Sequence, residues 1–314
     1  MLQRIYFYNF ESVKNLILKS SHGKDLNSMI RLFTDTSANL STELIEKNNI
    51  TVIPFSYTVN GVTQEYKKID DFDPKSFYAD MRAGAQIKTS MINIVSFILP
   101  FEEALKAGDD VIYIALSGAV SGSANAADIA AGELRESYPD RKIEAINSYG
   151  AGLGEGLLTL RAAKMIKDGL SFDEVVKGVL ELRSRICQYF TVDDLKYLKR
   201  GGRLSNIEAA VGILLNIKPV LTGDSTGHIV TIGKARGQRA ALNALAEKYD
   251  KLCKDKSDHI YINHSDNQEA VDQLIELLRK KGFTGEPVVV VYEPVCGTHV
   301  GPGALALFFE GTKK

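Results

Sequence analysis

The sequence predicts an α/β protein of two domains, an N-terminal three-layer α/β/α domain with a parallel sheet and a C-terminal α/β domain with a mixed sheet. The chain has 314 residues, which is too long for one ordinary core and about right for two domains. In its first half, short apolar runs alternate with helical patterns, as they do where helices connect parallel strands. In its second half, a hairpin pattern interrupts that alternation and indicates antiparallel pairing.

We expect the first domain over residues 30–165, after an N-terminal extension of residues 1–29 that mixes aromatic residues with a polar stretch. The first convincing strand pattern begins at Ile30. The strands expected in this domain are residues 30–34, 51–57, 110–116 and 142–147. The expected helices are residues 41–48, 74–83, 94–107, 123–138 and 152–167.

The second domain is expected over residues 166–314, with a crossover of the chain between the domains allowed. A hairpin is expected where strands 219–222 and 229–232 flank the turn at residues 224–227. The other expected strands are residues 188–192, 258–264 and 287–293. The expected helices are residues 172–185, 195–198, 207–215, 240–253 and 268–281.

Composition and charge argue against several classes of protein. Lys and Arg number 38 against 39 Asp and Glu, so the chain lacks the positive surplus that is typical of nucleic-acid binders. No apolar run reaches the roughly 18–20 residues that span a bilayer, and the N-terminal residues lack a signal-peptide pattern, so we expect a cytoplasmic protein. The three cysteines are far apart, and no cluster has the spacing of metal ligands, so we expect neither disulfides nor a metal.

Two short polar segments lie at strand ends or in turns, where ligands bind in open α/β sheets. Residues 34–37 (Thr-Asp-Thr-Ser) fit a turn and cap before the helix that begins at residue 41, and this structural interpretation is favoured. Thr89 and Ser90 place two adjacent hydroxyls in a predicted loop. Such a pair suits either an anion or an ordinary turn.

A glycine-rich segment, residues 116–123, lies between a predicted buried strand and a predicted helix. Its glycines let a ligand approach the backbone, and the unpaired N–H groups of a helix start attract carboxylates or phosphates. The segment equally fits a plain turn that is capped by Ser123. It matches neither the dinucleotide fingerprint nor the phosphate loop of nucleotide-binding proteins.

Two further segments carry a histidine and a group of cations. His299 lies in residues 297–303, whose glycines and proline predict a rigid loop, although a lone histidine is more often structural than catalytic. Arg200 and Arg203 lie with Lys199 around a Gly-Gly turn. These cations fit either solvated charge or an arginine that meets a phosphoryl group or the acidic face of a partner.

Three blocks of the sequence, in this order, resemble the DegV family of fatty acid-binding proteins, which includes the binding subunits of bacterial fatty acid kinase. The blocks are residues 192–205 (VDDLKYLKRGGRLS), 214–219 (LLNIKP) and 297–304 (GTHVGPGA). The likeness runs from about Ile30 to Phe309, which is nearly the whole chain after the extension.

The resemblance implies two α/β domains and a buried tunnel that holds one long-chain fatty acid, of the C16–C18 kind, with its carboxylate near the domain junction. By the same resemblance, Thr89 and Ser121 contact the carboxylate. Ser90 and the backbone N–H of Gly122 assist them, and His299 lies near the head group. The sequence departs from the family directly after Ser90 and after Gly122, which leaves the local loop shape open.

The resemblance also implies a carrier with no cofactor and no catalytic residue of its own. Arg200 and Arg203 match the family's basic Gly-Gly turn, which meets the kinase partner or the phosphoryl group. The implied partners are therefore the fatty acid, the catalytic subunit of a fatty acid kinase and, transiently, a membrane surface.

Two alternatives stay open. Ser121 and His299 are a nucleophile and a base of the kind found in esterases, although Ser121 does not lie in a Gly-x-Ser-x-Gly elbow. The second alternative is a binding module for another small anion, such as a sugar phosphate.

Overall fold

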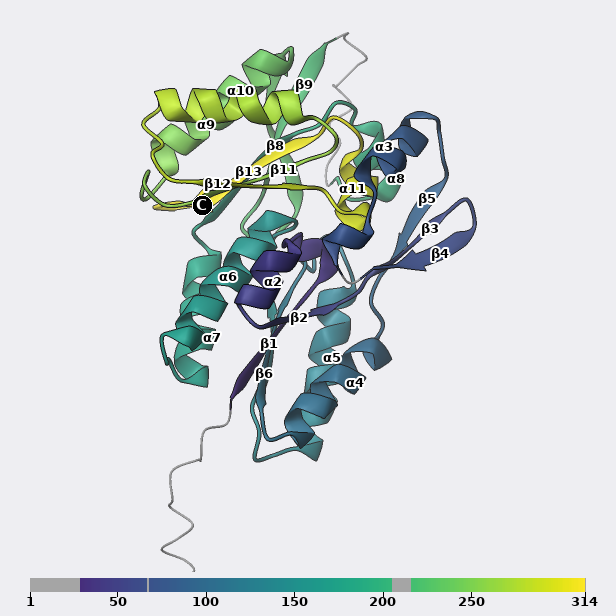
Figure 1. Ribbon diagram of the computed structural model, residues 1–314, viewed down its shortest axis with the longest axis vertical. Helices are drawn as coiled ribbons and strands as arrows, with labels where there is room; N and C mark the ends of the chain where they lie inside the picture. Colours follow the sequence, from purple (N-terminus) through teal and green to yellow (C-terminus); the bar gives the residue numbers. More distant parts are fainter. Residues whose placement is uncertain (1–28, 67, 205–215, 314) are drawn as a thin grey trace, which may run out of the picture.

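The computed structural model describes residues 29–66, 68–204 and 216–313 and contains two α/β domains that share one long helix (Figure 1). Residues 1–28 of the predicted extension (residues 1–29) and the predicted helix at residues 207–215 lie outside the described residues. Within the described part, no helix is long and apolar enough to cross a bilayer.

The first domain is built on a parallel four-stranded sheet in the order β2-β1-β6-β7. Its strands are β1 (Ile30–Asp35), β2 (Ile50–Ile53), β6 (Asp110–Ala115) and β7 (Ile143–Asn147). The flanking helices are α2 (Thr42–Lys47), α4 (Ile94–Lys106), α5 (Ser123–Ser137), α6 (Leu153–Lys167) and α7 (Phe172–Arg183). These elements follow the predicted ones closely.

Alternate residues of the central strands face the two helical layers. Phe33 of β1 packs edge-on against Phe101 of α4 with ring centroids 5.2 Å apart, and Tyr113 of β6 packs against Phe97 at 5.0 Å. Leu32, the neighbour of Phe33, belongs instead to the core on the α6 side. This alternation confirms the predicted α/β/α layering, since successive side chains of a strand point to opposite faces.

The second domain is built on a mixed six-stranded sheet in the order β10-β9-β8-β13-β11-β12, in which only β11 and β12 pair in parallel. Its strands are β8 (Ile186–Thr191), β9 (Ile217–Gly223), β10 (Ile229–Arg236), β11 (Ile260–His264), β12 (Pro287–Val291) and β13 (Leu305–Glu310). Helices α9 (Gln238–Leu252) and α10 (Gln268–Lys280) cover one face. The mixed sheet and its hairpin confirm the prediction, but β13 was not predicted.

A small antiparallel sheet, β4-β3-β5, was also missed. Its strands are β3 (Ser56–Val59), β4 (Val62–Glu65) and β5 (Ile87–Ser90), and α3 (Pro74–Arg82) follows β4. The strand predicted at residues 51–57 divides into β2 and β3 around Pro54, whose nitrogen has no hydrogen to donate. The predicted loop that contains Thr89 is the end of strand β5.

Helix α6 joins the domains because it packs on strands of both sheets. Its N-terminus is capped from the second domain, where Asn263 Oδ1 accepts a hydrogen bond of 2.8 Å from Leu153 N. Glycines allow this close packing, and a Cβ on Gly154 would lie 2.6 Å from Gln188 Oε1. The predicted domain boundary at residues 165–166 falls in the last turn of α6 and stays a prediction.

Candidate functional site

A cavity lies at the domain junction and encloses about 860 Å³, counted out to where it opens to solvent. Most of its wall is apolar, with residues from both domains, among them Phe55, Leu116, Val120, Phe190, Ile229 and Phe308. Hydroxyls, an imidazole and a guanidinium gather on the remaining wall, from Thr89, Ser90, Ser121, Arg203 and His299.

The polar wall is assembled from four distant segments of the chain. Thr89 and Ser90 end strand β5, Ser121 precedes α5, and His299 lies on α11 (Pro294–Val300). Arg203 follows α8 (Lys196–Gly201), which packs against α11. The structure therefore brings together five of the seven residues that the sequence singled out.

The other two residues lie beside the cavity. Gly122 is packed against Met91, since a Cβ there would lie 2.9 Å from the Met91 sulfur. Arg200 lines an adjoining pocket of about 750 Å³, which it shares with Thr89, Arg203 and His299. The two hollows therefore meet at the polar wall, and the adjoining one is the more basic.

His299 lies in the last turn of helix α11, so the predicted rigid loop was wrong for this residue. The helix forms because Glu293 caps it and Pro294 fills its first position, where a missing N–H costs nothing. Gly301, at φ 78°, then ends it. Gly297 thus lies within a helix and Gly301 ends it, so the glycines around His299 did not prevent a helix from forming.

The imidazole of His299 is bonded to the hydroxyl of Thr89, with Nε2 and Oγ1 2.9 Å apart. Burial, together with the positive charges of Arg203 and Arg200, lowers the pKa of His299 to about 4. The ring is therefore neutral near pH 7. In the tautomer that carries its proton on Nε2, the ring donates to Thr89, and the Thr89 hydroxyl keeps its own proton for an anion.

Ser121 is held in a comparable way. Ile92 N donates to Ser123 Oγ at 3.0 Å, and Ser123 Oγ lies 3.0 Å from Ser121 Oγ. When Ser123 donates its proton to Ser121, the Ser121 hydroxyl keeps a proton that it can direct into the cavity. Since Ile92 lies three residues after Thr89, these bonds also hold the segment of Thr89 beside the segment of Ser121.

Arg203 closes the polar wall with a fixed positive charge. Its Nε donates to the carbonyl oxygen of Val120 at 3.0 Å, and its Nη1 donates to the carbonyl oxygen of Gly201. These bonds tie the basic Gly-Gly turn of the second domain to the glycine-rich segment of the first. An anion at this wall thus meets hydroxyl donors and a positive field together.

The geometry gives no support to an esterase-like pair. His299 Nε2 is bonded to Thr89 instead of Ser121, and His299 Nδ1 has no hydrogen-bond partner in the described part of the chain. A serine nucleophile needs its base within hydrogen-bond reach, and the base needs an orienting group. Among the described residues, no group of three potential ligands has the arrangement of a metal site.

The segment at residues 34–37 forms the caps that were predicted and more besides. Asp35 caps a short 3-10 helix, Thr36–Ala38, and Ser41 caps α2. The segment also joins a fully buried group of polar side chains, here called the buried acid cluster, made up of Thr34, Asp35, Ser37, Tyr113 and Glu155. Glu155 comes from α6 and was missed, because nothing in a helical sequence marks one glutamate as buried.

The fold and the cavity define a class, a two-domain α/β binding protein with an apolar chamber at the domain junction and a hydroxyl-rich wall. The chain belongs to the DegV family, since the family model described as "Uncharacterised protein, DegV family" matches residues 29–312. A DegV domain-containing protein of Clostridium perfringens is 38% identical over 285 residues, which cover 90% of this chain and 98% of that protein. The predicted resemblance is therefore confirmed.

Two solved structures share this fold. A DegV family protein from Thermus thermophilus, described as binding fatty acid, gives a TM-score of 0.81 at 28% identity and covers 90% of this chain and 99% of its own. DegV of Bacillus subtilis, described as a fatty acid binding protein, gives a TM-score of 0.76 at 30% identity with the same coverage.

Proposed function

We propose that this protein binds one long-chain fatty acid in the junction cavity, with its carboxylate against Thr89 and Ser121. The observation that carries the proposal is a single cavity with apolar walls and a hydroxyl-rich wall. The relatives from Thermus thermophilus and Bacillus subtilis, both described as binding fatty acid, support it. Another small anion fits the apolar remainder of the cavity less well, because it would leave that wall without a partner.

The two ends of the ligand contribute differently to binding. Burial of about fourteen methylenes at ~0.8 kcal/mol each gives a gross gain of roughly 11 kcal/mol. Hydroxyls that donate to a carboxylate each contribute about 1.5–3 kcal/mol, because they replace the water that the anion loses. The chain thus supplies most of the affinity, and the polar wall decides which end of the ligand lies there.

We further propose that the basic pocket beside the polar wall receives a kinase that phosphorylates the bound acid. Arg200 and Arg203 line this pocket, and Thr89 and His299 line both hollows, so a carboxylate at Thr89 is reachable from either. A carboxylate oxygen would attack the terminal phosphorus of a nucleoside triphosphate on the partner, and the nucleoside diphosphate would leave. The arginines would stabilise the added charge of the acyl phosphate. In this scheme the chain is a carrier without catalytic residues.

Organic extraction of the purified protein, followed by mass spectrometry, tests the binding proposal. We expect the wild-type protein to release one long-chain fatty acid per chain. The double variant Thr89→Val, Ser121→Ala should bind that acid at least about 100-fold more weakly, because two donors to the carboxylate are lost. A matched variant with exposed hydroxyls removed, Thr63→Val with Ser137→Ala, should bind as the wild type does.

A different small anion in the extract, with no fatty acid, would contradict the proposal. So would a double variant that folds normally and retains the wild-type affinity. In the latter case the carboxylate would lie elsewhere in the cavity, and the roles given to Thr89 and Ser121 would be wrong.

A further inference from the structure

The direction of strand β8 shows which end of the cavity is deep. β8 runs from Ile186 to Thr191 and leads into α8, after which Arg203 reaches the polar wall. Phe190 and Gln188 line the cavity from β8, and Gln188 is the one farther from α8. Along β8, the cavity wall therefore runs from the side of α8 and Arg203 towards Gln188.

The register of β8 with β13 shows where the cavity stops. Gln188 lies directly opposite Phe308, and both line the cavity. The next pair on the same face is Ile186 opposite Glu310, and neither residue lines the cavity. The deep end therefore lies at the pair formed by Gln188 and Phe308.

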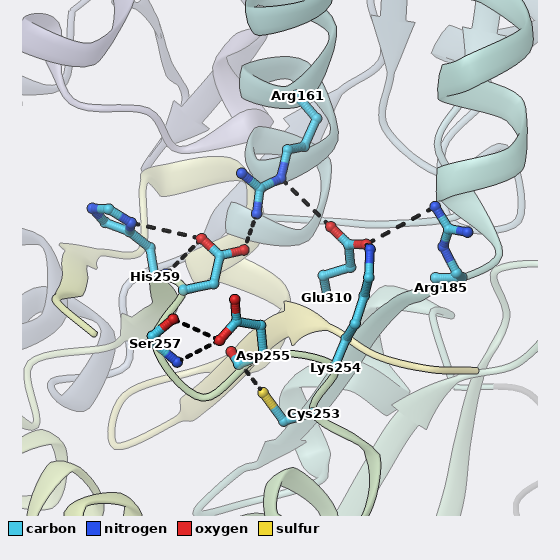
Figure 2. Close-up of polar contacts among 9 residues, drawn as sticks. Arg161, Arg185, Cys253, Lys254, Asp255, Ser257, His259 and Glu310 are labelled. Carbon is cyan, nitrogen blue, oxygen red and sulfur yellow. Dashed lines mark hydrogen bonds and ion pairs between the residues drawn. The ribbon is translucent and has the colours of Figure 1, made fainter. Parts of the chain in front are cut away.

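Glu310, the next residue of β13 on that face, belongs to a charged layer with Lys254, Arg161 and Arg185 (Figure 2). The carboxylate of Glu310 is 2.6 Å from Lys254 Nζ, 3.7 Å from Arg161 Nε and 3.9 Å from Arg185 Nη2. The Glu310 side chain is only 12% exposed, so these cations enclose it. An apolar chain cannot extend into this layer, because it would separate paired charges without replacing their partners.

Gln188 is fixed in place from the other side. Its Nε2 donates to the carbonyl oxygen of Tyr149 at 3.0 Å, and its Oε1 accepts from Ala151 N at 3.3 Å. A Cβ on Gly154 would lie 2.6 Å from Oε1, so α6 packs directly against the amide. The side chain joins the second domain to the loop before α6 and has no room to withdraw.

We propose that Gln188, with Phe308 opposite it, is the floor of the cavity and sets the longest acyl chain that the protein accepts. This inference rests on the proposed fatty acid binding and adds the residue that determines chain length. Each methylene buried before the floor strengthens binding about fourfold. A methylene beyond the floor must displace the amide from its two hydrogen bonds, so affinity falls once the chain is longer than the cavity.

Titration of the delipidated full-length protein with saturated straight-chain acids, each one carbon longer than the last, tests the floor. The wild-type protein should show rising affinity up to one chain length and a fall beyond it. Gln188→Ala should move this turning point to a longer chain by roughly two methylenes. In this variant, the acid two carbons longer than the wild-type optimum should bind about 15-fold more tightly than that optimum. Gln273→Ala, on the exposed face of α10, should keep the wild-type turning point.

If Gln188→Ala does not fold, the more conservative variant Gln188→Asn provides the same test. It retains an amide, shortens the side chain by one methylene and should shift the turning point by about one carbon. If folded Gln188→Ala or Gln188→Asn kept the wild-type turning point, Gln188 would not set the chain length. The proposed fatty acid binding would still stand. Wild-type protein that binds every acid with steadily rising affinity would also overturn the floor alone. Wild-type protein that binds no acid at all would overturn the proposed function, and the floor with it.

Discussion

The polar wall of the cavity and the buried acid cluster use the same kinds of side chain to different ends. Both combine hydroxyls with a titratable group whose pKa is shifted by burial. At the polar wall, Thr89 and Ser121 face a cavity and can each keep a proton for a ligand. In the buried acid cluster, every hydroxyl proton is already directed at a neighbour, and the hollow that Thr34 and Asp35 line measures only about 250 Å³.

In the buried acid cluster, Thr34 and Ser37 both donate hydrogen bonds to the carboxyl group of Glu155. Thr34 Oγ1 lies 3.0 Å from the Ile114 carbonyl oxygen and 3.0 Å from Glu155 Oε1. Thr34 has one hydroxyl proton, and both of these acceptors lie within hydrogen-bond distance of it. Burial, and then the charge of Asp35, raises the pKa of Glu155 well above its usual range.

The difference teaches that a shifted pKa alone does not mark a binding site. Asp35, Glu155 and Glu293 are all buried, and burial raises the pKa of each. Their partners are protein groups, which indicates a structural role at the junction of the domains. Hydrogen-bonding capacity that is left over and faces a cavity is the better sign of a ligand.

Removal of the Glu155 side chain should have the largest effect on stability. Glu155→Ala leaves Thr34 and Ser37 without their shared partner and opens a cavity, so we expect a loss of about 3–5 kcal/mol in the free energy of unfolding. Urea denaturation measures this loss. Glu181→Ala, on the exposed side of α7, should leave stability unchanged. If Glu155→Ala instead kept its stability and lost fatty acid binding, the two regions would be one site.

The sequence predicted the regular elements well where their patterns are local. The parallel sheet, its helices and the β9–β10 hairpin were all predicted, because period and turn residues define them. Strand β13 was missed, since its residues 305–309 are all apolar and buried on both faces, and such a run lacks alternation. His299 was assigned to a loop because the prediction relied on the glycines and the proline around it and overlooked Glu293, which caps helix α11.

The sequence predicted residues of the candidate site only where a polar or glycine-rich segment also resembled the DegV family. Thr89, Ser121 and His299 come together as tertiary neighbours from segments up to 210 residues apart, and no local pattern encodes that meeting. Gln188 and Glu155 were missed for the same reason. A polar residue in an apolar strand or a helix looks alike whether it lines a cavity, joins two domains or faces water.

Glu293, which caps the helix that carries His299, should have a smaller effect on stability that depends on pH. Burial raises its pKa from 4.5 to about 7, so the folded protein keeps a proton that the unfolded chain releases above pH 4.5. The stabilisation is full below pH 4.5 and is lost as the pH rises through 7, by up to about 3 kcal/mol. His264 and His299, whose pKa values are lowered, act in the opposite direction.

The difference between wild type and Glu293→Gln therefore isolates this effect. Urea denaturation between pH 5 and 8 should give a difference in unfolding free energy that varies with pH, whereas Thr63→Val, on the exposed strand β4, should give a constant one because it removes no titratable group. A pH-independent difference for Glu293→Gln would mean that Glu293 is charged throughout. The cap of α11 would then be a permanent carboxylate.

The smallest expected effect on fatty acid binding comes from His299. Because its pKa is about 4, the ring is neutral across pH 6–8, so its titration should not change wild-type affinity in that range.

His299→Ala leaves the hydroxyls of Thr89 and Ser121 in place and should spare fatty acid binding. In a reaction reconstituted with the proposed kinase partner, it should reduce acyl phosphate formation, because the ring lies where the cavity and the basic pocket meet. If both activities survived the change, His299 would serve only to pack α11 against Gly201. The polar wall would then consist of hydroxyls and Arg203 alone.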